Sequence, residues 1–180
     1  MKSGATGLPG VVLLEPRVYA DARGVFYESW NKRTLRDLQI DADFVQDNQS
    51  RSARGTLRGL HYQVEQVQGK LLRVIAGEVF DVVVDLRRSS PCFGKHVALR
   101  LNAETPQMLW VPPGFAHGFV VLSPVAEMHY KMTDYYAPQH ERSLLWNDPA
   151  LGIAWPLAAA PLLSAKDAAG IPLAQAQTYP

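Results

Sequence analysis

Glu78-Val79-Phe80-Asp81-Val82-Val83-Val84-Asp85 is the stretch of the chain with the strongest strand character. β-Branched and aromatic residues dominate it, and polar residues interrupt it at intervals. A second run, Lys70-Leu71-Leu72-Arg73-Val74-Ile75, precedes it, and Ala76-Gly77 supplies the turn between the two. These residues predict two consecutive β-strands joined by a tight turn.

Other short runs of the same kind occur along most of the chain, separated by Gly, Pro, Asn and Asp. We expect strands at Gly24 to Trp30, Phe44 to Gln49, His96 to Leu101, Met108 to Val111, Gly118 to Leu122 and Glu127 to Tyr135. Helix is expected only from Asn31 to Leu38, with Asn31 as the N-cap, and in a short turn from Ser164 to Ala169. Many short strands without alternating helices predict an all-β fold, an antiparallel sandwich or barrel.

The length and composition predict one domain that spans residues 1–180. Hydrophobic residues make up 47% of the chain and the formal net charge is only +1, whereas disorder would need fewer apolar residues and more charge. So small a charge gives no global field that would attract nucleic acid or a membrane. A local cluster of Arg and Lys must therefore attract any anionic ligand.

Cysteine usage and apolar runs predict a cytoplasmic protein. Cys92 is the only cysteine, which excludes an internal disulfide framework and a thiolate-rich zinc site. The apolar run Val11 to Leu14 is too short for the core of a secretory signal. The stretch Ile153 to Leu163 contains two prolines and is too short to span a bilayer.

Two of the five histidines lie in segments that could position a polar group. His61 follows Thr56-Leu57-Arg58-Gly59-Leu60, and His117 follows Pro112-Pro113-Gly114-Phe115-Ala116. Turn-forming residues just before a histidine favour a placed functional group over a side chain that only fills the core.

These segments, with Gly77-Glu78 between them, resemble the two histidine motifs of the cupin barrels. The resemblance implies a cupin-type, jelly-roll-like barrel of two packed antiparallel sheets with a few short helices. Metal-binding cupins use His-x-His, a following Glu and a second-motif His, but here Gln63 stands two residues after His61. Amides are poor ligands for transition metals, so we expect no metal, and we expect acid–base chemistry.

A narrower resemblance covers nearly the whole chain. Its motifs are Asp21 to Glu28, Phe44 to Asn48, Leu57 to Gln63, Gln68 to Lys70, Gly114 to Phe119, Tyr130-Lys131, Tyr135-Tyr136, Trp146 to Pro149 and Leu163 to Asp167. In this order they resemble the family of dTDP-4-dehydrorhamnose 3,5-epimerases. The resemblance implies an isomerase that uses no cofactor and inverts carbons 3 and 5 of a dTDP-linked 4-keto-6-deoxy sugar on the pathway to dTDP-L-rhamnose.

The resemblance also implies catalytic roles. A hydrogen beside a ketone is acidic only if the enolate is stabilised, so the enzyme needs a base, a cation or donor at the ketone oxygen, and an acid on the opposite face. His61 matches the base, Asp167 the carboxylate that orients it, Lys70 the group at the enolate oxygen and Tyr130 the acid. Asp148 is the alternative partner of His61, although Asp-Pro more often marks a turn.

The implied substrate-binding residues form a larger set. Arg23, Arg58 and Lys166 match positions that contact the diphosphate, and Tyr136 matches an aromatic residue that stacks on thymine. The other members offer amides, acceptors or lining groups: Phe26, Glu28, Gln46, Asn48, His117 and Glu141.

Most of these residues also have a purely structural interpretation. Without the resemblance, Arg23 and Glu28 suggest a surface pair, and Lys166-Asp167 suggests the capped end of a helix. Tyr130 and Tyr136 could be aromatics that pack on a sheet. The stretch from Gln63 to Gln68 suggests no function by its residues.

The family pattern further implies a homodimer whose N-terminal strands cross to the neighbouring subunit, so that Arg23, Phe26 and Glu28 serve the partner's cavity. The closest alternative is a 3-epimerase or 5-epimerase of an antibiotic-sugar pathway on the same scaffold, and a residue other than tyrosine at position 130 would have favoured it. A metal-dependent cupin oxygenase and a non-catalytic sugar-nucleotide binding module are further alternatives.

Overall fold

The valine-rich run Glu78–Asp85 forms strand β8, which lies between β9 (His96–Asn102) and β11 (Phe115–Val121). Its alternate side chains enter two apolar environments because both faces of the strand are covered. Val79 and Val83 belong to the largest core cluster, whereas Val82 and Val84 pack in a second cluster with the C-terminal segment. This central strand explains why the run is apolar on both faces.

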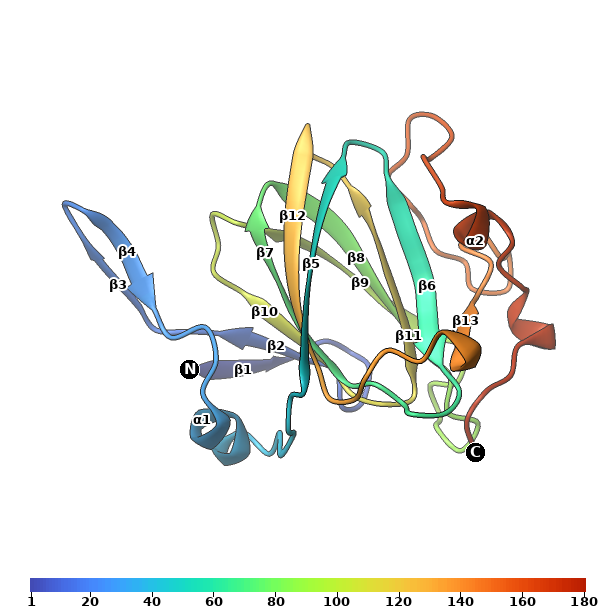
Figure 1. Cartoon of the computed structure of the whole chain (residues 1–180), viewed down its shortest axis with the longest axis horizontal. Helices are drawn as coiled ribbons and strands as arrows, with labels where there is room; N and C mark the ends of the chain where they lie inside the picture. Colours follow the sequence, from blue (N-terminus) through green and yellow to red (C-terminus); the bar gives the residue numbers. More distant parts are fainter.

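The computed structural model describes all of residues 1–180, which form two main antiparallel sheets and one separate hairpin (Figure 1). The six-stranded sheet has the order β1 (Lys2–Ala5), β2 (Val12–Glu15), β10 (Met108–Val111), β7 (Lys70–Ala76), β12 (Val125–Met132) and β5 (Gln46–Ala53). The five-stranded sheet has the order β13 (Glu141–Ser143), β6 (Leu57–Gln63), β11, β8 and β9. The predicted all-β, cupin-type architecture is confirmed.

Both predicted helices are present and short. Helix α1 (Lys32–Asp37) begins after Asn31, whose side chain accepts hydrogen bonds from two backbone amides of the first turn. Its Leu35 packs in a cluster with residues of β2, β7 and β10, so α1 covers the outer face of the six-stranded sheet. Helix α2 (Ala165–Ala168) has Ser164 as its N-cap.

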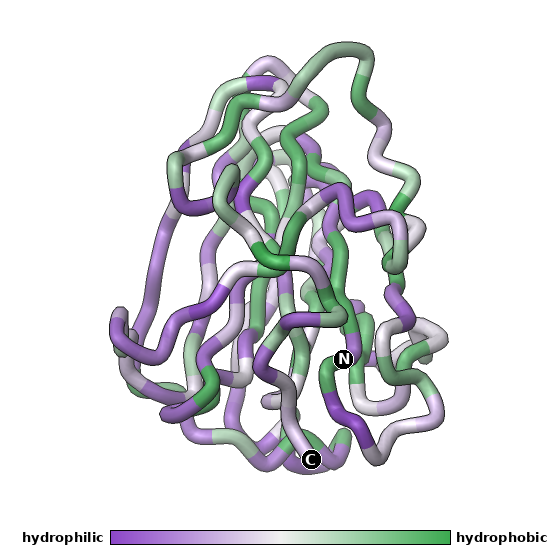
Figure 2. Tube along the Cα trace, turned by 90° about the vertical axis from the view of Figure 1, so that its right-hand side faces the viewer, coloured by the Kyte–Doolittle hydropathy of each residue, from purple (hydrophilic) through white to green (hydrophobic).

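Short 3₁₀ turns complete the structure at η1 (Pro138–His140) and η2 (Leu173–Gln175). Figure 2 shows hydrophobic stretches alternating with hydrophilic ones along the strands in the middle of the molecule. No helix is both long enough and apolar enough to cross a membrane.

Several strand boundaries differ from the prediction because pairing partners, and not local hydrophobicity, decide them. β5 starts at Gln46 and continues to Ala53, since all eight residues pair with β12. β12 ends at Met132 instead of Tyr135, and the strand predicted from Gly24 to Trp30 ends at Tyr27. Five strands were not predicted as such because they are short, polar or interrupted by glycine: β1, β2, β3 (Val18–Asp21), β6 and β13.

A two-stranded hairpin, β3 (Val18–Asp21) and β4 (Gly24–Tyr27), projects from the body of the molecule (Figure 1). Its large apolar side chains are exposed, and Phe26 is 74% exposed. An isolated hairpin with two four-residue strands is at best marginally stable in water. The hairpin therefore carries apolar surface that this single chain leaves uncovered.

Candidate active site

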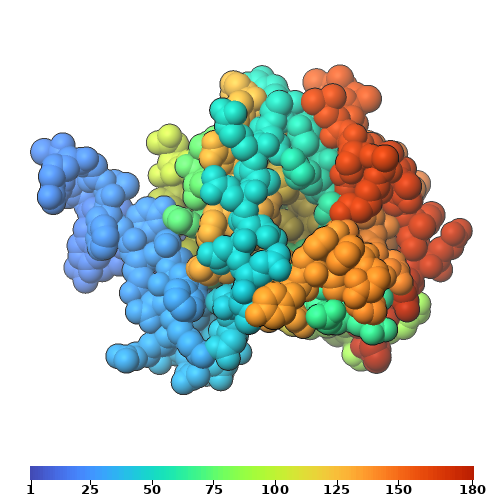
Figure 3. All heavy atoms as spheres, in the orientation of Figure 1, coloured from blue at the N-terminus to red at the C-terminus, as the bar shows by residue number.

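A cavity of about 280 Å³ opens between the two main sheets. Strands β6 and β11 supply side chains from one sheet, and β5, β7 and β12 supply side chains from the other. Most of the side chains that line it are polar, which suits a polar ligand. Figure 3 shows the hollow in the surface between the cyan strand β5 and the orange and red C-terminal third.

Two glycines let β6 and β11 approach closely enough to place both histidines. A Cβ atom on Gly59 would lie 2.5 Å from the Cα of Gly118, and a Cβ on Gly118 would lie 2.6 Å from the carbonyl oxygen of Arg58. Gly59 also has a φ of +129°, a conformation that other residues rarely adopt. In the resulting register His61 and His117 are direct neighbours across the two strands.

His61 is paired with the buried carboxylate of Asp167. The His61 Nε2 atom lies 2.5 Å from Asp167 Oδ1, which also accepts the backbone N–H of Gly59 at 3.2 Å. Ser164 Oγ donates to Asp167 Oδ2 at 2.6 Å. Burial would raise the pKa of Asp167, but the hydrogen bonds from His61 and Ser164 outweigh burial and lower this pKa to about 2. Asp167 is therefore a carboxylate at neutral pH.

This pairing decides which nitrogen of His61 is basic. An ionised carboxylate can only accept, so the Nε2 atom of His61 carries the hydrogen in their contact. The neutral ring then has its lone pair on Nδ1. Burial lowers the pKa of His61 below its usual value, against the opposing effect of Asp167, and nearby Lys166 and Lys70 lower it further. His61 is thus a neutral base at neutral pH.

Lys70, on β7, brings a buried cation to the same cavity. Its Nζ donates to the backbone oxygen of His61 at 3.2 Å, and only 8% of the residue is exposed. Burial lowers the pKa of Lys70 to about 8, although the carboxylates of Glu141 and Asp81 oppose the shift. The ammonium group is therefore mostly charged at neutral pH and could stabilise a developing oxyanion.

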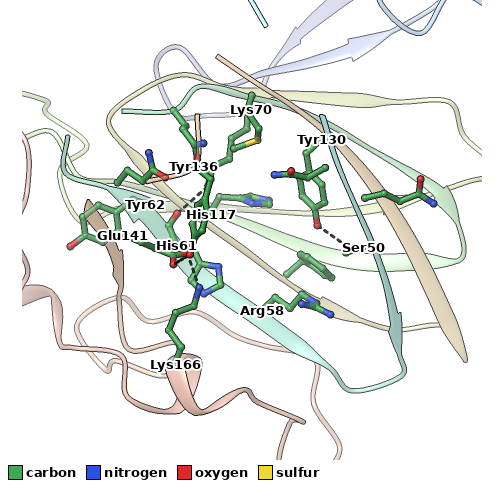
Figure 4. A pocket seen from close by; sticks show the side chains of 16 residues that line it. Ser50, Arg58, His61, Tyr62, Lys70, His117, Tyr130, Tyr136, Glu141 and Lys166 are labelled. Carbon is green, nitrogen blue, oxygen red and sulfur yellow. Dashed lines mark hydrogen bonds and ion pairs between the residues drawn. The ribbon is translucent and has the colours of Figure 1, made fainter. Parts of the chain in front are cut away.

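Tyr130 enters the cavity from β12, on the sheet opposite to His61 (Figure 4). Its hydroxyl lies 3.2 Å from Ser50 Oγ. Burial raises the pKa of Tyr130 well above its usual range, and the negative charge of Asp81 adds to the effect. The side chain is therefore a neutral phenol that can donate a proton.

A second histidine–carboxylate pair lies deeper in the molecule. His117 Nε2 lies 2.8 Å from Asp81 Oδ2, and both residues are buried. The other carboxylate oxygen of Asp81 has no hydrogen-bond partner. The functional prediction from the sequence missed Asp81. The signal was present, however, because a single acid interrupts the valine-rich run of β8 on its inward face.

The mouth of the cavity combines acceptors, cations and an aromatic ring. Glu141 accepts hydrogen bonds from Tyr136 Oη and Lys166 Nζ, each at 2.7 Å. Burial would raise the pKa of Glu141, but these two bonds and the charge of Lys166 lower it. Arg58 lines the cavity and donates to Ser52 at 3.0 Å. The cations suit an anionic ligand.

Two predicted amides lie on β5 beside this group. Asn48 lines the cavity and accepts a hydrogen bond from Gln46 Nε2 at 2.9 Å. Gln46 does not line the cavity; its Oε1 accepts the backbone N–H of Tyr136 at 2.9 Å. Gln46 therefore contacts the loop that carries Tyr136.

The hairpin and the segment after it hold the remaining predicted residues, and the fold of one chain does not bring them to the cavity. Arg23 is paired with Asp21 in the same hairpin at 2.5 Å, so the alternative structural interpretation, a surface pair between Arg23 and Glu28, does not hold. Glu28 instead accepts hydrogen bonds from Asn31 and Thr34 at the start of α1. All of these contacts are local, since they join residues close in sequence.

The alternative carboxylate, Asp148, does not contact His61. It accepts the backbone N–H groups of Ala150 and Leu173 at 3.0 and 2.7 Å, as expected for a residue that holds a turn. No three His, Cys, Asp or Glu side chains are grouped so that they could hold a metal ion.

The amino-acid sequence is similar to that of known proteins. Residues 5–175 match the family model described as dTDP-4-dehydrorhamnose 3,5-epimerase. The chain is 58% identical over 181 residues to dTDP-4-dehydrorhamnose 3,5-epimerase of Pseudomonas aeruginosa, and the match covers 100% of both chains.

Solved structures of related epimerases are similar to this one in fold and sequence. The crystal structure of dTDP-6-deoxy-D-glucose-3,5-epimerase from Legionella pneumophila in complex with dTDP-4-keto-L-rhamnose has a TM-score of 0.95 and 49% identity, and the match covers 98% of this chain and 94% of that one. A 3'-monoepimerase from Streptomyces bikiniensis in complex with dTDP-quinovose is more distant, with a TM-score of 0.88, 34% identity and coverage of 93% and 86%. The chain belongs to the dTDP-4-dehydrorhamnose 3,5-epimerase family.

Proposed function

We propose that this isomerase inverts carbons 3 and 5 of dTDP-4-dehydro-6-deoxy-D-glucose and gives dTDP-4-dehydro-L-rhamnose without a cofactor. Residues 1–180 act as one catalytic domain. One observation carries the proposal. A neutral base, His61, and a neutral acid, Tyr130, enter one cavity from two different sheets, with the cation of Lys70 beside them.

The first step is removal of a proton from a carbon next to the ketone. Nδ1 of His61 accepts the proton, and the electron pair of the C–H bond forms the enolate. Lys70 stabilises the negative charge on the enolate oxygen, and Asp167 stabilises the imidazolium. In the glucose chair the hydrogens on carbons 3 and 5 are both axial on one face of the ring, so one base can serve both carbons.

The second step is return of a proton to the opposite face. Tyr130 donates its phenolic proton to the enolate carbon, which inverts that carbon and restores the ketone. The phenolate then takes a proton from solvent and the imidazolium of His61 releases one to solvent, so both groups return to their starting states. His117 lines the cavity between His61 and Tyr130. Its ring packs edge-on against that of Tyr130, with 6.4 Å between the ring centroids.

The rest of the cavity mouth binds the nucleotide. Arg58 and Lys166 contact the diphosphate, for which guanidinium and ammonium donors are suited. Tyr136 stacks on the thymine ring, and Glu141, Gln46 and Asn48 position polar groups of the substrate, directly or through Tyr136.

One experiment tests the proposed reaction. The protein is incubated with dTDP-4-keto-6-deoxyglucose in heavy water, and the sugar is followed by NMR. Deuterium incorporation with inversion at both carbons is the expected result. Exchange at carbon 3 or carbon 5 alone would show a mono-epimerase, and no exchange at either carbon would overturn the proposal.

Replacement of Tyr130 by phenylalanine should separate the two steps. The ring stays, but its proton is lost, so we expect completed inversion to fall by about 100-fold while solvent exchange through His61 falls much less. Tyr135→Phe is the matched control, because Tyr135 is exposed and does not line the cavity. Equal losses of exchange and inversion would contradict the role of Tyr130 as the acid.

We also propose that the protein is a homodimer in which the two subunits exchange hairpins, and that it is located in the cytoplasm. The exposed apolar side chains of β3 and β4 support the dimer, since a partner would cover them. In this arrangement Arg23, Phe26 and Glu28 complete the partner's cavity. A fold that depends on no disulfide, with Cys92 as a free thiol, suits a reducing compartment.

Mixing two inactive variants tests the hairpin exchange. Arg23→Ala removes a group of the hairpin, and His61→Asn removes the base of the cavity. If hairpins are exchanged, a mixed dimer contains one complete site, so mixing after dissociation should restore about a quarter of wild-type activity, since about half of the dimers are mixed. If each hairpin serves its own cavity, no complete site forms and mixing restores nothing. A monomer in sedimentation would likewise contradict the exchange.

A further inference from the structure

Gln63 lies two residues after His61 on β6 and lines the same cavity. Only 3% of the residue is exposed. A buried amide needs hydrogen-bond partners, and unpaired polar groups at such a depth are costly. The partners of Gln63 therefore indicate what the side chain does.

Its amide group binds three backbone groups. Nε2 donates to the carbonyl oxygens of Gln66 and Tyr135 at 2.7 and 3.2 Å, and Oε1 accepts the N–H of Ala137 at 2.9 Å. The amide therefore uses both hydrogens of Nε2 and one acceptor site of Oε1. The bonds to Tyr135 and Ala137 flank a single residue, Tyr136.

The loop that begins after β12 is held at further points. Gln68 Nε2 donates to the carbonyl oxygen of Asp134 at 2.9 Å, and the N–H of Gly69 donates to Thr133 Oγ1 at 2.7 Å. The ring of Tyr136 lies at the cavity mouth, with its hydroxyl bound to Glu141, although half of the residue is exposed. Side chains from the Gln63–Gln68 segment therefore fix the backbone on both sides of this ring.

We propose that Gln63 is a positioning residue for Tyr136, and that it sets the affinity of the cavity for the nucleoside base. The proposal rests on the proposed function, in which Tyr136 stacks on thymine. A stacking ring binds tightly only if the loop is already in place, because ordering a free loop on binding costs affinity. Gln63 supplies that order without touching the reacting carbons.

An amide suits this position for a chemical reason. Glutamate would replace the NH2 group by an oxygen, an acceptor that faces two carbonyl oxygens. Methionine would leave all three backbone groups unpaired. Gln63→Met has nearly the same length and adds no charge, so it removes the hydrogen bonds with little change in volume.

The test measures binding and turnover separately. For Gln63→Met we expect the Kd of dTDP and the KM of the sugar nucleotide to rise about tenfold, the usual scale of one base-stacking contact, while kcat changes less than about threefold. Binding of inorganic pyrophosphate, which lacks the base, should stay unchanged. In a Tyr136→Ala background the Gln63 substitution should weaken dTDP binding less than about twofold, since coupled residues are not additive.

Gln66→Asn is the matched control. The Gln66 side chain is exposed and makes no hydrogen bond, and asparagine tolerates its φ of +48°. This variant should bind dTDP as the wild type does. If Gln63→Met does not fold, Gln68→Met, which releases Asp134 in the same loop, should give the same selective loss of dTDP affinity.

Three results would overturn the proposal. Unchanged dTDP affinity in Gln63→Met, with a loss in Tyr136→Ala, would remove the role of Gln63 and leave the proposed function intact. Equal weakening of dTDP and pyrophosphate would indicate general disruption of the cavity. Failure of the wild type to bind dTDP would overturn the proposed function and the inference with it.

Discussion

Replacement of His61 by asparagine is expected to abolish both epimerisation and solvent exchange. The pairing with Asp167 occupies Nε2 of His61 and leaves the lone pair on Nδ1 free to act as the base in the cavity. A general base contributes roughly 10²–10⁴-fold to such a reaction, and we expect turnover to fall by at least about 1,000-fold, in the upper half of that range. Binding of dTDP should remain, because the side chains that we propose to bind the diphosphate and the base are others.

Calorimetry with dTDP and NMR in heavy water check the two halves of this prediction. His129→Asn is the control, since His129 lies on β12 near Asp47 and does not line the cavity. It should keep near wild-type exchange. If His61→Asn retained more than about a tenth of the exchange rate, the loss would be far smaller than expected for removal of the base. Another residue would then have to remove the proton.

The pH profile of the wild type gives an independent measure. His61 must be unprotonated, and its lowered pKa puts the acidic limb of kcat/KM below the usual value of 6.5. Lys70 must be charged, and its pKa of about 8 puts the alkaline limb there. Activity should therefore rise as pH increases toward neutrality and fall again through about pH 8. Lys70→Arg should shift only the alkaline limb.

Features with a local signal could be predicted from the sequence. Strand β8 is a continuous apolar run, and α1 carries its own N-cap in Asn31, so neither depends on distant residues to be found. Strand β6 is different. Its glycine and polar residues have weak strand preference, and backbone pairing with β11 and β13 holds it.

The same distinction applies to the candidate site. Most of the side chains that the family pattern marks in the sequence lie at one cavity in the structure, including His61, Lys70 and Tyr130. Asp81 and Gln63 were not assigned because their importance depends on partners distant in the chain, His117 and the loop around Tyr136. The lone acid in the valine-rich run of β8 marks Asp81 as unusual, but no pattern within a few residues identifies these partners.

The role of the hairpin residues could not be predicted for a different reason. Arg23 and Phe26 match substrate-binding positions, but a single chain carries them away from its own cavity. Whether they reach a cavity depends on a second subunit, which neither local sequence nor the fold of one chain contains. This is why the mixing experiment, and not a single substitution, tests their role.

Replacement of Asp167 by asparagine should cost nearly as much as loss of the base itself. The asparagine side chain keeps the size of aspartate but can donate its amide N–H to Nε2 of His61, which moves the ring hydrogen to Nδ1. The lone pair then points at Asn and away from the substrate. Wrong-tautomer substitutions in other histidine–aspartate pairs cost about 10⁴-fold in kcat, and we expect about 10³–10⁴-fold here.

Asp148→Asn is the control for this prediction, because Asp148 is also buried near the C-terminus and binds only backbone N–H groups. It should lower thermal stability without a comparable loss of kcat. Nitrogen-resolved NMR of His61 provides a readout that a purely structural role of Asp167 would not move: the wild type should show hydrogen on Nε2 and the variant hydrogen on Nδ1. An unchanged tautomer together with a large loss of activity would mean that Asp167 acts mainly by stabilising the charged imidazolium, whereas an unchanged kcat would remove it from the mechanism.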